Sequence, residues 1–200
     1  MTIVCVANFK GGTGKTTTAI HLAAYLQTLA PTLLVDGDIV RASTKWANRG
    51  NLPFKVTPIG QMARHVKDYT HIVIDTEANP SEDDFKEAAE GCDLLVIPAE
   101  PETTAKDGLI FTLAKLQAIG HKHHRVLLTK VPPLPQTEGQ QLRAGLVADA
   151  IPVFKADIPL LVAFKKASAA GTTVDQLKND RNARRAWIAY RSVGEEITHG

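Results

Sequence analysis

The feature that most constrains this chain is a glycine-rich segment between a strand pattern and a helical pattern. Residues 3–7 form a short apolar run rich in β-branched residues, which is typical of a buried parallel strand. Apolar residues recur at helical spacing between residues 19 and 29, and Pro31 follows as a stop. A strand, a glycine-rich turn and an amphipathic helix in this order predict a loop that binds phosphate.

Residues 10–17 of this loop read Lys-Gly-Gly-Thr-Gly-Lys-Thr-Thr. Glycines allow successive backbone N–H groups to point at phosphate oxygens, and the start of the following helix adds a favourable dipole. We expect Lys15 to reach the β- and γ-phosphates and the Thr16 hydroxyl to bind Mg²⁺. The residues expected to contact the nucleotide phosphates are Gly11, Gly12, Thr13, Gly14, Lys15, Thr16 and Thr17.

Beyond the loop, strand patterns alternate with helical patterns. We predict strands over 33–35, 54–56, 71–74, 93–97 and 125–129 and helices over 42–47, 61–66, 82–90, 104–119 and 138–148. This alternation predicts an α/β fold with a doubly wound, mainly parallel sheet flanked by helices. After residue 152 the pattern is mostly helical, and one packing face of the last helix is expected to carry Ala186, Tyr190, Val193 and Ile197.

Length and composition limit the class of protein. A chain of 200 residues with 44% hydrophobic and 22% charged residues is expected to fold as a single domain over residues 1–200. Cys5 and Cys92 lie in apolar runs without metal-ligand spacing, so we expect buried reduced thiols. The sequence shows no basic leader and no apolar run as long as a bilayer requires, which indicates a soluble cytoplasmic protein.

Residues 8–17 depart from the general phosphate-loop pattern at two positions. Phe9 stands where the pattern has glycine, and Lys10 is an additional lysine. In both respects the segment resembles the deviant Walker A box of the ParA/MinD family of P-loop ATPases. The resemblance implies ATP and Mg²⁺ as cofactors, ATP hydrolysis, and a homodimer in which Lys10 reaches the partner's nucleotide as a transition-state cation.

Two acidic segments follow in the order that the same family shows. Residues 35–38 match its D-x-D segment, and the resemblance implies that Asp38 positions the attacking water and that Asp36 lies near the metal. Residues 71–76 match Walker B, which places Asp75 in the Mg²⁺ shell. Departures from the family are Ile39, where proline is common, and Glu77 and Ala78, where proline or small residues are usual.

Two weaker patterns leave alternatives open. Residues 129–135 are rich in proline. Lys130 and Pro132 contact the nucleotide base, belong to a stiff surface loop, or form part of a proline motif that another domain binds. Basic residues near the C-terminus either bind nonspecific DNA through phosphates or form a solvated helix face. These residues are Lys155, Lys165, Lys166, Arg181, Arg184 and Arg185.

The resemblance implies a partition or positioning ATPase. ATP would drive dimerisation, the dimer would associate with nucleoid DNA, and a small adaptor protein would stimulate slow hydrolysis and release. Plasmid DNA and a protein compartment such as a carboxysome are both open as cargo.

Three alternatives remain open. A MinD-like membrane regulator would use the tail residues Trp187, Ile188 and Tyr190 as an anchor. A metal-cluster relative would need paired interface cysteines, and a binding module without catalysis would make no use of Lys10, Asp38 and Asp75.

Overall fold

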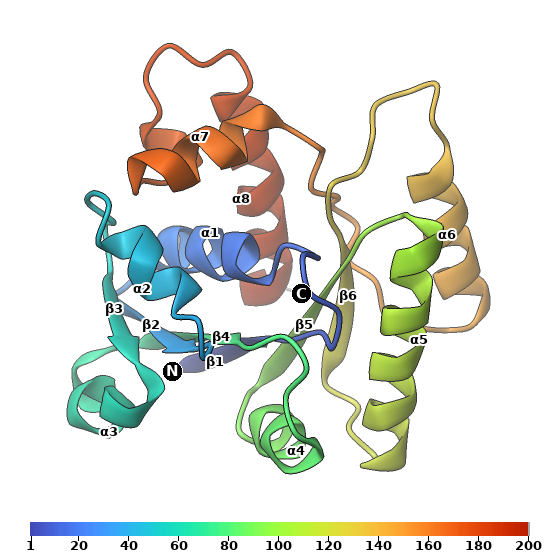
Figure 1. Cartoon of the computed structure of the whole chain (residues 1–200), viewed down its shortest axis with the longest axis horizontal. Helices are drawn as coiled ribbons and strands as arrows, with labels where there is room; N and C mark the ends of the chain where they lie inside the picture. The colour runs from blue at the N-terminus through green and yellow to red at the C-terminus, as the bar shows by residue number, and fades with distance from the viewer. Residues whose placement is uncertain (200) are drawn as a thin grey trace.

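A six-stranded parallel sheet forms the centre of the molecule (Figure 1). It belongs to a computed structural model that describes residues 1–199, with the side chains of residues 103–106 outside the description. The strands are β1 (Thr2–Val6), β2 (Thr32–Gly37), β3 (Lys55–Pro58), β4 (His71–Thr76), β5 (Leu94–Ala99) and β6 (His124–Leu128). Their order in the sheet is β3-β2-β4-β1-β5-β6. The predicted mainly parallel α/β fold is therefore confirmed.

Helices cover both faces of the sheet (Figure 1). One face carries α1 (Lys15–Gln27), α2 (Ala42–Ala47), α7 (Val162–Ala170) and α8 (Ala183–His199), together with the short helix η3 (Val174–Gln176). The other face carries α3 (Met62–His65), α4 (Glu82–Glu90), α5 (Thr103–Ala118) and α6 (Glu138–Ala148), with η1 (Ile59–Gln61) and η2 (Val66–Asp68) beside α3.

Alternation along each strand divides the core into layers. In β1, Val4 and Val6 pack into the cluster under α1 and α8, whereas Cys5 packs into the cluster under α4, α5 and α6. All three side chains have no exposed surface. Strands that are buried on both faces are apolar at consecutive positions, which explains why these segments could be recognised in the sequence.

Helix α1 differs from the expected amphipathic helix because it is buried almost all round. Residues 18–26 of this helix are all buried, including the polar residues Thr18 and His21. The sheet covers one side of α1, and α7 and α8 cover the other (Figure 1). The helix ends at Gln27, so Leu29 lies outside it and is 52% exposed rather than packed.

The C-terminal helix closes the core over α1. Ala186, Tyr190 and Val193 are buried and Ile197 is packed against the same cluster, as the sequence predicts. The Tyr190 hydroxyl hydrogen-bonds the Thr18 hydroxyl of α1 at 3.1 Å. Among the described residues, no helix combines the length and apolar character needed to cross a bilayer.

The strand order places the phosphate loop at the centre of one sheet edge. Strand β1 lies between β4 and β5. The helix after β1 covers one face of the sheet, whereas the helices after β4 and β5 cover the other face. In open parallel sheets, the carboxyl ends of the strands at such a point form the ligand crevice. The loop after β1 and the acidic ends of β2 and β4 therefore meet at one edge.

Candidate functional site

The phosphate loop has a backbone that only glycine adopts without strain. Gly12 and Gly14 have φ angles of 83° and 92°, in the left-handed region. Gly14 precedes the first helical residue, Lys15, and its carbonyl accepts from Thr18 N–H at 2.8 Å. The first N–H groups of α1 have no partner within the helix and lie beside the loop, which together suit an anion.

The residues before the loop anchor it to α5. Asn8 is 1% exposed, and its Oδ1 accepts from Lys10 N–H at 2.9 Å and from the Thr112 hydroxyl at 3.2 Å. Its amide donates to the Pro98 carbonyl at 2.7 Å. Phe9, which replaces the usual glycine, packs between aromatic rings of α4 and α5. The unusual start of the loop is therefore fixed by packing and buried hydrogen bonds.

Lys10 leaves the loop alongside α5. A Cβ atom at Gly108 would lie 2.7 Å from the Lys10 Cβ, which is closer than two such atoms approach. Only glycine at position 108 permits this arrangement. The Lys10 carbonyl, in turn, accepts from the Lys15 ammonium at 2.9 Å.

Lys15 lies among the acidic side chains that the sequence predicts. It is 7% exposed. Burial lowers the pKa of its ammonium, while the charges of Asp75 and Asp38 act in the opposite direction. The structure therefore brings together the phosphate-loop lysine and both carboxylates.

Asp75 is the most strongly perturbed of the acids. It has no exposed surface, and burial raises the pKa of its carboxyl to about 7, against the lowering effect of the Ser43 and Thr16 hydroxyls. Oδ2 accepts from the Ser43 hydroxyl at 2.7 Å. Within the described part of the chain, Oδ1 is buried without a hydrogen-bond partner.

Asp36 lies beside Asp75 in register but is used by the protein itself. Its Oδ2 accepts from the Thr44 backbone N–H at 2.8 Å and from the Thr44 hydroxyl at 2.5 Å, and its Oδ1 accepts from Asp38 N–H at 3.1 Å. These bonds hold the start of α2 against β2. The predicted role of Asp36 near the metal stays a prediction, and the structure adds this structural role.

Asp38 lies on the loop between β2 and α2. It is half-buried, and its Oδ1 accepts from Val40 N–H at 3.0 Å. The next two side chains, Ile39 and Val40, are 81% and 61% exposed. A carboxylate flanked by exposed apolar residues suits a site that a second protein surface covers.

The residues at this edge fit Mg²⁺ as it binds with nucleotides. Mg²⁺ usually takes one or two protein oxygens together with phosphate oxygens and waters, so it needs no all-protein cage. The described residues contain no group of three or more His, Cys, Asp or Glu side chains arranged for a metal ion. The unpartnered Asp75 Oδ1 and the nearby Thr16 hydroxyl supply the expected type of ligand.

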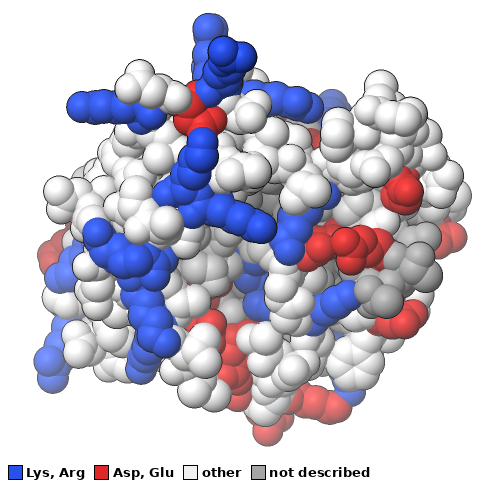
Figure 2. Space-filling view, turned by 45° about the horizontal axis from the view of Figure 1, so that its top comes forward, with Lys and Arg blue, Asp and Glu red and all other residues white. Residues whose placement is uncertain are grey.

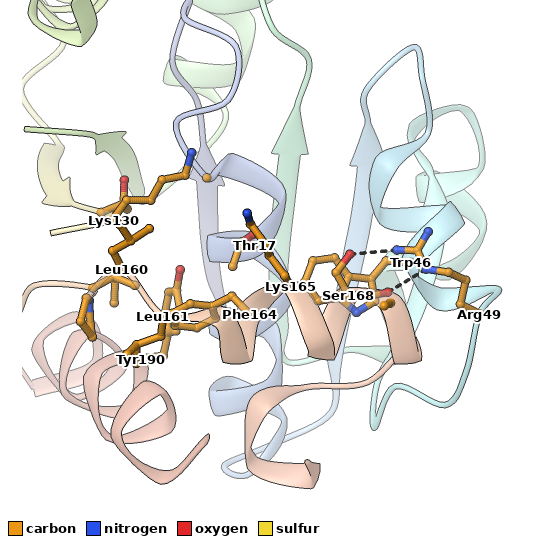
Figure 3. A pocket seen from close by; sticks show the side chains of 15 residues that line it. Thr17, Trp46, Arg49, Lys130, Leu160, Leu161, Phe164, Lys165, Ser168 and Tyr190 are labelled. Atoms are coloured by element: carbon orange, nitrogen blue, oxygen red, sulfur yellow. Dashed lines mark hydrogen bonds between the residues drawn. The ribbon is translucent and has the colours of Figure 1, made fainter. Parts of the chain in front are cut away.

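A cavity of about 640 Å³ continues from the phosphate loop toward α7 (Figure 3). Figure 3 shows Thr17 of α1 and Lys130 near its loop end, with Leu160, Leu161 and Phe164 along it. At its far end, Arg49 Nε donates to the Ser168 carbonyl at 2.7 Å. The apolar walls and the neighbouring phosphate loop suit a nucleotide base and ribose.

Lys130 and Pro132 are placed differently from each other. Lys130 lines the cavity, but its ammonium donates to the Gly12 carbonyl at 2.6 Å and to Glu100 at 2.8 Å, which braces the phosphate loop. Among the described residues that line the cavity, Pro132 is not present. Its contact with a base stays a prediction.

The predicted basic residues are all exposed but do not form one patch. Lys165 and Lys166 lie on α7, and the arginines lie at or before the start of α8. Lys155 instead donates its backbone N–H to Glu196 at the other end of α8. With a rise of about 1.5 Å per residue, Glu196 lies about 18 Å along the helix from Arg184. Figure 2 shows lysine and arginine gathered over the upper and left parts of one face. Lys155 is thus separated from the other five.

Both cysteines are free, with Cys5 buried and Cys92 half-buried.

Trp187 packs against the core cluster and Tyr190 is 1% exposed, so these large residues of α8 serve the fold.

Residues 4–174 match the family described as the CobQ/CobB/MinD/ParA nucleotide binding domain. The chain belongs to this family. It is 34% identical over 202 residues to the maintenance of carboxysome distribution protein A of Gloeobacter kilaueensis, covering 98% of this chain and 93% of that protein. It is 26% identical to the protein ParA of Rhizobium radiobacter, covering 94% and 91%.

Solved structures of this nucleotide-binding family share the fold. Apo McdA of Cyanothece has a TM-score of 0.77 at 17% identity, covering 96% of this chain and 99% of that one. An ATP complex of Cyanothece McdA has a TM-score of 0.78 at 16% identity, covering 98% and 95%. MinD of Pyrococcus horikoshii with Mg-ADP has a TM-score of 0.70 at 17% identity, covering 99% and 96%.

Proposed function

We propose that this chain is a Mg-ATP-dependent positioning ATPase that acts as a single domain and dimerises face to face across two nucleotides. The observation that carries the proposal is the convergence of Asp38 and Asp75 on the phosphate-loop residue Lys15. The 34% identity to a carboxysome-distribution protein favours a protein compartment as cargo. The ParA relative keeps plasmid DNA as the second possibility.

In this proposal the loop N–H groups and Lys15 hold the phosphates, and Thr16 and Asp75 hold Mg²⁺, with Asp36 beside them. Bound Mg²⁺ would neutralise charge on the β- and γ-phosphates. Lys15 would exchange its present bond to the Lys10 carbonyl for a phosphate oxygen, which is a stronger charge-assisted bond. ATP binding would therefore release the Lys10 segment from an internal contact.

Asp38 would orient the attacking water and accept its proton. Lys10 of each subunit would reach the partner's nucleotide and stabilise charge on the transferred phosphoryl group. Since Lys10 at each nucleotide would come from the partner subunit, turnover by one subunit alone would be slow. A small adaptor protein would accelerate it, and the ATP-bound dimer would hold nucleoid DNA through its basic residues.

Sedimentation with saturating Mg-ATP tests the dimer directly. We expect the Asp38→Ala variant to dimerise and not to hydrolyse ATP, because the phosphate contacts remain while the water-orienting acid is lost. Lys10→Ala should bind ATP and remain monomeric. Phosphate release measured on the same samples separates binding from hydrolysis. A monomeric Asp38→Ala variant that binds Mg-ATP would contradict the proposed switch.

A further inference from the structure

The two oxygens of the Asp75 carboxylate are used unequally. Oδ2 accepts from the Ser43 hydroxyl at 2.7 Å, and both residues have no exposed surface. Oδ1 is equally buried and, among the described residues, has no hydrogen-bond partner. A buried carboxylate oxygen without a donor is costly, so it calls for a cation or a polar ligand.

Ser43 is itself held rigidly. It lies in α2, whose next residue, Thr44, donates both its backbone N–H and its hydroxyl to Asp36 on β2. Arg41, just before the helix, has a φ of 55° and donates from its guanidinium to the Asp36 carbonyl at 3.1 Å. These contacts fix α2 against β2, and the Ser43 hydroxyl then joins α2 to β4.

A fixed hydroxyl on one oxygen determines the rotation of the carboxylate. The carboxylate is planar, so once Oδ2 is hydrogen-bonded to Ser43 the direction in which Oδ1 points is fixed as well. Partners of this kind are known to orient metal ligands in proteins, and their loss lowers metal affinity by about 10- to 100-fold.

We infer that Ser43 is a positioning residue that orients Asp75 so that Oδ1 faces the Mg²⁺ of the bound nucleotide. This inference rests on the proposed function, because it requires a Mg-nucleotide at the site. The same hydrogen bond would link the Asp38 loop to the metal, since Ser43 lies in the first turn of α2, which follows that loop.

The test compares nucleotide binding with and without Mg²⁺. A fluorescent N-methylanthraniloyl derivative of ATP is titrated with the full-length protein in EDTA, and Mg²⁺ is then titrated into the complex. We expect Ser43→Ala to lower the apparent Mg²⁺ affinity at least about tenfold and to leave Mg²⁺-free binding unchanged. Ser43→Thr, which keeps the hydroxyl, should restore the wild-type Mg²⁺ dependence.

A matched control is the hydroxyl of Thr57 on β3, which is 1% exposed and has no hydrogen-bond partner within the described chain. Thr57→Val also removes a buried hydroxyl, and it should leave the Mg²⁺ titration unchanged. A purely structural role for Ser43 would lower thermal stability and change binding equally in EDTA and in Mg²⁺, which would overturn the inference.

The remaining outcomes separate this inference from the proposed function. If the wild-type protein binds Mg-nucleotide and Ser43→Ala has the same Mg²⁺ dependence, the inference alone is wrong. If the wild-type protein binds no nucleotide, the proposed function fails and the inference fails with it. Should Ser43→Ala not fold, Ser43→Cys supplies a second test, because a thiol is a weak donor. Its Mg²⁺ affinity should also fall, and an unchanged affinity would overturn the inference.

Discussion

At the scale of single residues, His21 shows how polar groups are accommodated behind the phosphate loop. Its Nδ1 donates to the Thr17 carbonyl at 2.7 Å, and its Nε2 accepts from Val174 N–H at 3.2 Å. The ring stacks on Tyr190 at 4.8 Å between centroids. Since Nε2 accepts a hydrogen bond, it carries no proton and the imidazole is neutral. Burial lowers the pKa of His21 to about 4.

This lowered pKa predicts loss of stability in acid. The pKa of His21 falls from about 6.5 in the unfolded chain to about 4 in the fold, so stability is present above pH 6.5 and is lost as pH falls toward 4. From pH 7 to pH 5 this single group should lower the free energy of unfolding by about 2 kcal/mol. Urea unfolding at the two pH values measures the change.

His21→Phe provides the comparison, because it keeps an aromatic ring and cannot titrate. The variant should be less stable at pH 7, since Thr17 and Val174 lose a hydrogen-bond partner. Its loss between pH 7 and pH 5 should be smaller by about 2 kcal/mol than that of the wild-type protein. An equal loss in both proteins would show that other groups cause the acid sensitivity.

The site residues divide according to whether a local pattern identifies them. The phosphate loop follows from glycine spacing between a strand and a helix, and Asp75 follows from the match of residues 71–76 to Walker B. Ser43 and Thr112 could not be predicted in the same way, because their roles depend on contacts 32 and 104 residues away along the chain. For Lys130, the sequence indicated the right loop, but only the fold shows that its ammonium holds the Gly12 carbonyl.

At the scale of elements, packing between α1 and α8 depends on a missing side chain. A Cβ at Gly194 of α8 would lie 2.1 Å from the Tyr25 ring of α1, and Tyr25 is only 6% exposed. The two helices can approach closely only because this position is glycine.

Gly194→Ala should therefore destabilise the protein by about 1–3 kcal/mol, as overpacking of a core does. Gly145→Ala in α6 is the matched control, since nothing lies within 4 Å of its added Cβ. The control should be neutral or more stable by up to about 1 kcal/mol, because alanine favours helices. Thermal unfolding of both variants measures the difference, and equal destabilisation would contradict the packing argument.

Element identities follow from the sequence more closely than element surroundings do. Helices α2, α4 and α6 have the predicted bounds, and every predicted strand is present within a few residues. The prediction of an amphipathic α1 was wrong, because hydrophobic periodicity describes one face of a helix and cannot show that α7 and α8 cover the other. The separation of Lys155 from the remaining basic residues was missed for the same reason, since it depends on how α8 lies.

At the scale of the whole molecule, the exposed basic residues of α7 and of the start of α8 predict where the proposed DNA binding would take place. Lys165 on α7 and Arg184 on α8 are exposed, whereas Lys166 is paired with Asp180 at 2.7 Å. Phosphate contacts by such residues give affinity without sequence choice and weaken as salt rises.

Reversing the charge of Lys165 and Arg184 should weaken binding of the ATP-bound protein to unrelated DNA at least about tenfold at 0.1 M salt. Lys155→Glu, at the far end of α8, should have a much smaller effect. Fluorescence anisotropy with two unrelated duplexes measures both, and ADP-bound protein should bind neither. Equal retention with ADP and ATP would contradict nucleotide-controlled DNA binding.

The close approach of Gly108 to Lys10 separates two properties of the same loop. The stem of Lys10 takes its direction from α5, whereas Lys15 and the loop N–H groups take theirs from α1. A side chain at position 108 would redirect Lys10 and leave the phosphate contacts of its own subunit in place. In the proposed dimer, helix α5 would therefore influence how two subunits recognise each other while each continues to bind its own nucleotide.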